Sequence, residues 1–196
     1  MDSRNTDPAS EADERTLIAR FRGGDVAAFD ALVESHHARV YRLAWRLSGN
    51  ADDADTLTQD VFVQAFRALP QFDGRSRFMT WLYAITVRKS LDLRRARKRQ
   101  PALTLSDRVD PALDLRRPMS QDPSLALEEK ELNETLNQAI LKLPAEQSAA
   151  LTLVVQEGMS YREAARALRC SQGTVAWRVW NARRLLRDML GDRLKS

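Results

Sequence analysis

Apolar residues recur three and four positions apart along most of the chain, which is the spacing of one buried face of a helix. No segment keeps the period-two alternation that is typical of a half-buried strand. We therefore predict an all-α fold. The first predicted helix carries Leu17, Ile18 and Phe21 and stops at Gly23 and Gly24. Residues 1–13 before it are polar and acidic, and we expect them to be disordered.

Three further helices complete a first predicted domain over residues 14–99. Asp25 is expected to cap the second helix, Asp52 or Asp53 the third and Ser76 the fourth. Gly49 ends the second helix and Pro70 the third. The fourth helix runs into a basic segment, residues 94–99. The buried positions predicted for the second and third helices are Phe29, Leu32, Val33, Val40, Leu43, Ala44, Leu47, Leu57, Val61, Ala65 and Leu69.

A segment rich in proline and aspartate, residues 100–123, has no regular apolar face, and we interpret it as a flexible linker. The second predicted domain covers residues 124–196. Its first helix starts at Ser124. Its second helix starts at Pro144, ends at Gly158 and is expected to bury Leu151, Val154 and Val155. Two helices follow, over residues 161–168 and from residue 172 to about residue 190.

The last two helices have the pattern of a helix-turn-helix. Ser160 can cap the first helix, and its small residues Ala164 and Ala165 allow another helix to approach closely. Ser171 can cap the second helix, which is expected to bury Val175 and Val179. The opposite face carries polar and basic residues suited to the DNA major groove. The alternative is a helical hairpin with a solvated basic face. The residues expected on the DNA side are Ser171, Gln172, Thr174, Ala176, Trp177, Arg178, Asn181, Arg183 and Arg184.

Two sets of motifs then resemble one family. In the first domain they are DADTLTQDVF (53–62) and FDGRSRFMTWL (72–82); in the second they are LPAEQ (143–147), GMSYRE (158–163) and GTV (173–175). In this order and spacing they are similar to regions 2.2 to 2.4 and region 4 of the extracytoplasmic-function (ECF) sigma factors of the sigma-70 family. The resemblance covers nearly everything after residue 13.

The resemblance implies a sigma factor, not an enzyme, that directs core RNA polymerase to promoters by recognising −10 and −35 elements. It implies contacts with the coiled coil of the largest (β′) subunit and with the β flap, and control by an anti-sigma factor. An acidic face next to an exposed Phe62 suits the coiled coil. The implied polymerase-binding residues are Asp55, Thr56, Gln59, Asp60 and Phe62. The implied −10 DNA-binding residues are Phe72, Arg75, Arg77, Thr80, Trp81, Tyr83, Arg88, Lys89, Arg94 and Arg95.

Five positions depart from the family's usual residues. Thr56 stands for Asp, Arg88 for Asn, Arg169 for Gly, Ala176 for a cation and Trp177 for Ser. Arg169 is expected to be strained if its backbone is left-handed. The loss of a cation at Ala176 removes a contact to phosphate or guanine. We expect one of Trp177 and Trp180 to be buried and the other to stack on DNA or contact its sugars.

The composition of the chain excludes several kinds of site. The chain has a net charge of +4 with 30% charged and 43% hydrophobic residues, and Cys170 is its only cysteine. Neither a disulfide within the chain nor a cysteine-based metal cluster is possible. The neighbouring His36 and His37 point to different helix faces, so we expect no metal and no cofactor. No apolar run reaches the roughly 18 residues that span a bilayer, and we expect a cytoplasmic protein.

Two other functions stay open at this point. A sigma-like decoy would bind polymerase or an anti-sigma partner without initiating transcription, and the departures at Thr56 and Ala176 motivate this alternative. A helix-turn-helix repressor would bind duplex DNA as a dimer. The absence of a dimerising apolar stripe and the presence of residues 72–81 argue against the repressor.

Overall fold

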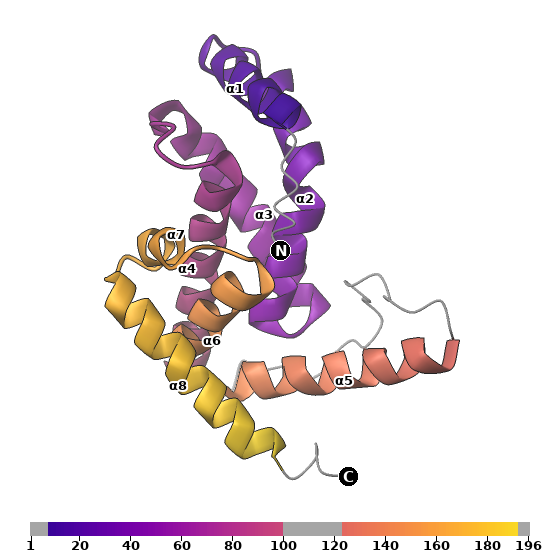
Figure 1. Cartoon of the computed structure of the whole chain (residues 1–196). Helices are drawn as coiled ribbons and strands as arrows, with labels where there is room; N and C mark the ends of the chain where they lie inside the picture. The colour runs from indigo at the N-terminus through magenta and orange to yellow at the C-terminus, as the bar shows by residue number, and fades with distance from the viewer. Residues whose placement is uncertain (1–7, 100–122, 192–196) are drawn as a thin grey trace.

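The computed structural model describes residues 8–99 and 123–191, with side chains described over 13–99 and 133–191. Within these ranges all regular structure is helical, as the sequence predicts. The first domain contains α1 (Pro8–Arg22), α2 (Ala27–Ser48), α3 (Ala51–Ala68), a 3₁₀ turn (Leu69–Gln71) and α4 (Phe78–Arg99) (Figure 1). Helix α1 begins inside the segment expected to be disordered, so that expectation is wrong for residues 8–13.

The second domain contains α5 (Pro123–Lys142), α6 (Ala145–Leu151), a π-helical turn (Thr152–Gln156), α7 (Tyr161–Ala167) and α8 (Gln172–Leu190). Helix α5 contacts α2 and α8 and extends away from the rest of the molecule, α6 and α7 lie against α4 of the first domain, and α8 packs on the outer side of α6 and α7 (Figure 1). The predicted linker lies outside the described residues, except for Pro123 at the start of α5.

The helix ends follow local hydrogen bonding. Asn50, not Asp52 or Asp53, caps α3: its side chain accepts a hydrogen bond from the Asp53 backbone N–H at 2.8 Å. Asp53 occupies the third helical position, where its carboxylate accepts from Asn50 Nδ2 at 2.7 Å. Val26, not Asp25, occupies the N-cap position of α2, and its side chain makes no capping hydrogen bond. Asp25 lies one position earlier, and the pKa of its carboxyl is lowered by the hydrogen bond from Arg20 and by backbone N–H groups of Ala28 and Ala27.

The hydrophobic core is shared by the two domains. Leu43, Leu82 and Ile85 of the first domain belong to one continuous buried cluster with Leu153 and Val175 of the second. The domains pack together, and α4 lies against both α6 and α7 (Figure 1). Val154 is half-buried and Val155 is exposed, which corrects the sequence prediction that both are buried.

Polar groups also join the two domains. Glu157, which follows the π-helical turn, pairs with Arg46 of α2 and accepts a hydrogen bond from the Tyr83 hydroxyl of α4 at 2.6 Å. Arg94 of α4 donates to the carbonyl oxygens of Leu141 and Leu143, both at 3.0 Å. These carbonyls lie at the end of α5, where intrahelical donors run out, so Arg94 satisfies groups that the helix cannot satisfy itself.

Candidate functional site

Helix α7 begins with a reciprocal cap. The Ser160 hydroxyl accepts from the Glu163 backbone N–H at 3.2 Å, and the Glu163 carboxylate accepts from the Ser160 N–H at 2.9 Å. The hydrogen bond from Ser160 is the main cause that lowers the pKa of Glu163. Ala164 and Ala165 are buried, as predicted for the helix that α8 crosses. The prediction of this helix and of its cap is therefore confirmed.

The turn between α7 and α8 holds a strained residue. Arg169 has a φ of 51°, in the left-handed region that disfavours a side chain. Ser171 follows and caps α8 by accepting from the Thr174 N–H at 3.0 Å. Val175 and Val179 of α8 are 0% and 1% exposed, as the helical spacing predicts. The turn and the buried valines fix which face of α8 points outward.

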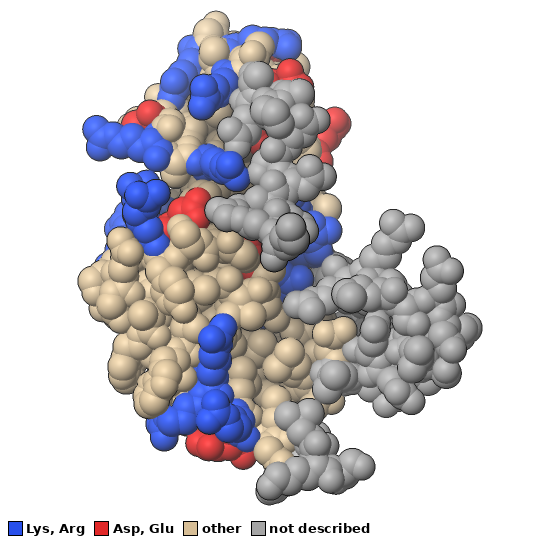
Figure 2. Space-filling model, viewed as in Figure 1, with Lys and Arg blue, Asp and Glu red and all other residues tan. Residues whose placement is uncertain are grey.

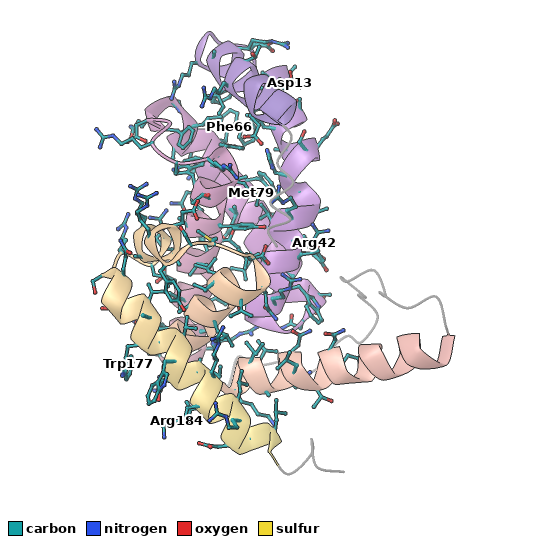
Figure 3. The ribbon with its side chains drawn as sticks, viewed as in Figure 1. Asp13, Arg42, Phe66, Met79, Trp177 and Arg184 are labelled. Atoms are coloured by element: carbon teal, nitrogen blue, oxygen red, sulfur yellow. The ribbon has the colours of Figure 1, made fainter. Side chains whose placement is uncertain are left out.

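The outward face of α8 is aromatic as well as basic. Trp177 is 57% exposed and Trp180 is 61% exposed, so the expectation that one of them is buried is wrong. The Arg184 guanidinium lies over the Trp180 ring at 5.8 Å from its centroid. Trp177 and Arg184 both project from α8 away from the first domain (Figure 3). The other exposed positions among the predicted −35 residues are Ser171, Gln172, Ala176 and Arg183.

Three residues predicted for the same DNA surface have partners within the protein. Arg178 forms an ion pair with Glu146, lies 3.6 Å from the Cys170 sulfur and is only 16% exposed. Asn181 accepts a hydrogen bond from Arg184 at 2.9 Å. Thr174 lies within hydrogen-bond distance of the Ser171 hydroxyl at 2.9 Å. The cation most central to the helix is therefore turned inward.

The loop before α4 presents arginines above packed aromatic rings. Phe72 and Phe78 are 7% and 3% exposed, and both contact the half-buried Trp81, with ring centroids 5.1 and 5.6 Å away. Arg75 and Arg77 are exposed, and Thr80 is half-buried. The Phe72 side chain, predicted as a DNA contact, thus lies beneath the surface because it packs against the first turns of α4.

The remaining residues predicted for −10 DNA lie along α4. Tyr83 is buried beside Glu157, whose charge adds to burial in raising the pKa of the phenol. Burial, followed by the nearby Arg169, lowers the pKa of Arg88, and burial lowers the pKa of Arg94. Two further members of this set pair with carboxylates: Lys89 with Asp60 at 3.1 Å, and Arg95 with Asp92 and Glu146, each at 3.4 Å.

Helix α3 presents the acidic face. Asp55, Thr56, Gln59 and Asp60 are exposed, as expected for a partner surface. Phe62 is 8% exposed and its ring is stacked on His37, with centroids 6.1 Å apart, so the prediction of an exposed Phe62 is wrong.

The apolar part of the α3 surface is formed by residues that the sequence analysis missed. Val63 is 51% exposed and Phe66 is 41% exposed. They lie seven and ten positions after Thr56, on the same helix face, so helical spacing from Thr56 could have found them.

A cleft of about 290 Å³ lies where the loop before α4 meets α1 and α7. Its charged lining consists of Glu14, Arg15, Arg75, Arg77, Arg162, Glu163 and Arg166. Across it, Arg166 Nη1 donates a hydrogen bond to the Arg75 carbonyl oxygen at 3.5 Å. Lysine and arginine side chains gather over this part of the molecule, with a second group over the lower half of α8 (Figure 2).

A buried histidine of α2 lies beside a carboxylate of α1. His36 is buried, with its Nε2 3.2 Å from a Glu14 carboxylate oxygen and its ring against Phe78. Within residues whose side chains are described, no group of three potential metal ligands occurs. No described helix is long and apolar enough to cross a membrane.

The comparisons with known proteins agree over both domains. Residues 32–100 match the family model Sigma-70 region 2, and residues 133–186 match Sigma-70, region 4. The ECF RNA polymerase sigma factor SigE of Mycolicibacterium smegmatis is 40% identical over 193 residues, covering 95% of this chain and 72% of that protein.

Two solved structures have a similar fold. One is CnrH in complex with the cytosolic domain of CnrY, with a TM-score of 0.65, 27% identity and coverage of 92% of this chain and 98% of that one. The other is the sigma factor RpoE of Bartonella quintana with the anti-sigma factor NepR, with a TM-score of 0.64, 25% identity and coverage of 83% and 96%. With both regions present in order, the chain belongs to the ECF sigma factors of the sigma-70 family.

Proposed function

We propose that this sigma factor brings core RNA polymerase to promoters by reading the −35 element with α8 and the −10 element with the loop before α4. The observation that carries the proposal is the outward face of α8. Its valines are buried and its exposed residues follow a capped turn, the geometry of a recognition helix. We propose further that the protein works in the cytoplasm and is not an enzyme.

The proposed −35 contacts are of three chemical kinds: polar, apolar and basic. Ser171, Gln172 and Thr174 lie at the N-terminus of α8, the end that enters the major groove in such motifs. Ala176 and Trp177 follow on the same face and offer apolar contacts. Arg183 and Arg184 lie farther along the helix, where guanidinium groups can bind phosphates. Arg178 and Asn181 are proposed to support this surface, since each is engaged within the protein.

The proposed −10 contacts lie on and behind the arginine loop. Arg75, Arg77 and Thr80 are accessible, and Phe72 and Trp81 stiffen the loop from below. A base taken out of the stack needs such a rigid, cation-rimmed site, because unstacking costs a few kcal/mol. The proposed contacts farther along α4 are Tyr83, Arg88, Lys89, Arg94 and Arg95.

The proposed polymerase surface is the exposed face of α3. Asp55, Gln59 and Asp60 supply acidic and polar groups for the coiled coil of the largest subunit. Val63 and Phe66 supply the apolar part that was first attributed to Phe62. Thr56, where relatives usually have Asp, removes one charge, and its hydroxyl instead donates to the Asp52 carbonyl at 2.9 Å. The β flap is the second proposed polymerase contact.

The closed packing of the two domains supports control by an anti-sigma factor. In this arrangement Tyr83 and Arg94 are bound to groups of the second domain, and Arg88 lies beside Arg169. These residues can meet DNA only when the domains separate. The solved structures of similar fold are CnrH in complex with the cytosolic domain of CnrY and the sigma factor RpoE in complex with the anti-sigma factor NepR. We propose that a comparable partner holds this chain closed.

Run-off transcription with purified core polymerase tests the function. Promoters selected from genomic fragments should give specific transcripts with the wild-type protein and none with core polymerase alone. The variant R75A/R77A should lose promoter opening but keep binding to a −35 fragment. The variant R183A/R184A should lose binding to the −35 fragment but keep promoter opening. If the protein adds no promoter-specific initiation to core polymerase, the proposal is wrong.

A second candidate function is a sigma-like decoy. Two observations favour it: Ala176 lacks a cation, and Arg178 is paired with Glu146 instead of facing outward. Both reduce the positive charge that α8 can offer DNA. Footprinting of the polymerase complex on a selected promoter separates the functions, because a decoy leaves both elements unprotected.

A further inference from the structure

We propose that Glu146 of α6 is a specificity-determining residue for the −35 element, because it holds Arg178 inward and so prevents α8 from reading guanine. This inference rests on the proposed function, in which the N-terminal half of α8 lies in the major groove. It goes beyond that function, since it assigns part of the base preference to a residue of a different helix, in the first turn of α6.

The first argument is the composition of the N-terminal half of α8. Between Gln172 and Val179, Arg178 is the only charged residue, and the other arginines of the helix begin at Arg183. In a helix-turn-helix this half of the recognition helix contacts the base edges. Guanine is read mainly by an arginine or lysine that binds its O6 and N7 atoms. The position of the Arg178 side chain therefore decides whether this half of α8 can read guanine.

The second argument is that two contacts hold the Arg178 guanidinium inward. Its Nη2 atom donates to Glu146 Oε2 in an ion pair, and its Nη1 atom lies 3.6 Å from the Cys170 sulfur, in the turn before α8. The Arg178 side chain is only 16% exposed. A hydrogen bond between guanidinium and carboxylate is stronger than one between neutral groups. Arg178 must give up this bond before it can extend toward a base.

The third argument is that local structure fixes the carboxylate beside α8. Helix α6 (Ala145–Leu151) follows Pro144, and Glu146 lies in its first turn, where the positive end of a helix favours an acidic side chain. Helix α6 also packs against α8. Glu146 is therefore a fixed anchor for Arg178.

The pair with Arg178 does not depend on the closed packing of the two domains. The other carboxylate oxygen of Glu146 accepts a hydrogen bond from Arg95 Nη2 of α4 at 3.4 Å, and Arg95 belongs to the first domain. Glu146, Cys170 and Arg178 all belong to the second domain. When the domains separate, Glu146 loses Arg95 but keeps Arg178. The restraint on Arg178 therefore also acts in the protein that is bound to a promoter.

The consequence is a base preference set by a side chain that is held back. Specificity is a difference between affinities, so a site that withholds its cation gives guanine no advantage over the other bases. The exposed part of this half of α8 then offers Ala176 and Trp177, which make apolar contacts. If the ion pair instead served only to pack α6 on α8, its loss would change stability and leave the base preference as it is.

Selection from promoters randomised over the −35 element, by the full-length protein with purified core polymerase, tests this role. E146Q keeps the size of the side chain but removes its charge, which frees Arg178. It should enrich guanine at one −35 position by roughly fivefold or more over wild type, the lower end of what an arginine–guanine pair discriminates. E146D keeps the carboxylate and should keep the wild-type preference. D188N removes one negative charge at an exposed position of α8 and is the control for a general gain in affinity.

Variants of Arg178 complete the test. E146Q/R178A should lose the added preference for guanine. R178A alone should weaken all −35 sequences alike, because Arg178 supports α8 without touching a base. Since the Glu146 side chain is 46% exposed, its replacement should leave the fold intact, which circular dichroism checks.

Three results would count against the inference. If E146Q selects the same bases as wild type, or if R178A alone changes the base preference, Glu146 does not set specificity and the inference is wrong, although the proposed function stands. If wild type with core polymerase selects no −35 sequence at all, the proposed function fails and the inference fails with it.

Discussion

The Tyr83 hydroxyl donates a hydrogen bond to Glu157 Oε2 at 2.6 Å, across the boundary between the two domains. The other carboxylate oxygen of Glu157 pairs with Arg46, and the glutamate side chain is only 10% exposed. One carboxylate thus joins α2 and α4 of the first domain to the segment that precedes the helix-turn-helix. A buried group with two partners from another domain makes the closed arrangement specific, since separation leaves the Glu157 carboxylate without either partner until water enters.

We predict that E157Q opens the protein. The substitution removes the charge that pairs with Arg46, which should lower the free energy of unfolding by about 1–3 kcal/mol. The larger open population should raise the apparent affinity for core polymerase several-fold. Small-angle scattering measures the radius of gyration, and E34Q, at an exposed position of α2, is the control. An unchanged radius in E157Q would show that Glu157 does not hold the domains together.

We predict that Tyr83 makes the closed form sensitive to alkali. Burial, then the charge of Glu157, raises the pKa of the phenol well above its ordinary value of 10.0. The folded protein therefore keeps the proton at a pH where the unfolded chain has released it. This contribution to stability is complete below about pH 10 and is lost as the pH rises further. Urea unfolding between about pH 8 and 11 should show a smaller alkaline decline in Y83F than in wild type; equal slopes would assign the decline to other groups.

We predict that R169G stabilises the helix-turn-helix. Arg169 has a φ of 51°, a conformation that costs a residue with a side chain about 1 kcal/mol more than glycine. The variant should raise the free energy of unfolding by that amount. R169A is the matched control, because it removes the charge near Arg88 but keeps the backbone penalty. An equal gain in R169A would point to relief of charge repulsion instead of strain.

We predict that Val63 contributes to polymerase binding and Phe62 to folding. V63S alters an exposed side chain, so it should weaken binding to core polymerase by about 1 kcal/mol without changing the thermal midpoint. F62A removes a ring that is 8% exposed and should lower the free energy of unfolding by about 3 kcal/mol. Fluorescence anisotropy measures the binding and urea titration the stability. If F62A weakens polymerase binding and V63S lowers stability, Phe62 is the contact residue.

The contrast between these two residues shows what helical periodicity can and cannot predict. The spacing of apolar residues correctly identified Val175 and Val179, since each helix needs one buried face. It could not predict exposure near the edge of that face, which depends on a neighbour. Phe62 is covered because His37 of α2 lies over it. Nothing described covers Trp177, so a large apolar residue stays exposed.

The sequence could not predict the cap of α3 or the contacts between the domains, for two different physical reasons. Both Asn50 and the aspartates after it are good capping residues, and the choice depends on where Gly49 turns the chain. The roles of Glu157 and Arg94 are set by packing between segments distant in sequence. A charged residue that joins two domains has the same local pattern as one that is solvated, so only the structure could distinguish them.

We predict that α8 reads thymine methyl groups in the −35 element. Trp177 and Trp180 are exposed and Ala176 is exposed beside them, whereas Arg178 is held by Glu146. The middle of the helix therefore offers apolar contacts in place of guanine-binding cations. Replacing thymine by uracil in a selected −35 fragment should weaken wild-type binding about fourfold per contacted methyl, from the roughly 0.8 kcal/mol of a buried methylene.

The tryptophan variants show whether these side chains make the methyl contacts. W177A and W180A should bind the thymine fragment more weakly and lose part of the penalty for uracil, because the apolar partner of the methyl is gone. R184A should weaken both fragments equally, since a phosphate contact does not distinguish the bases. Fluorescence anisotropy at fixed salt measures all four proteins. If uracil costs wild type nothing, the tryptophans contact sugar or a protein partner, and the sequence preference of α8 must arise at Gln172 and Thr174.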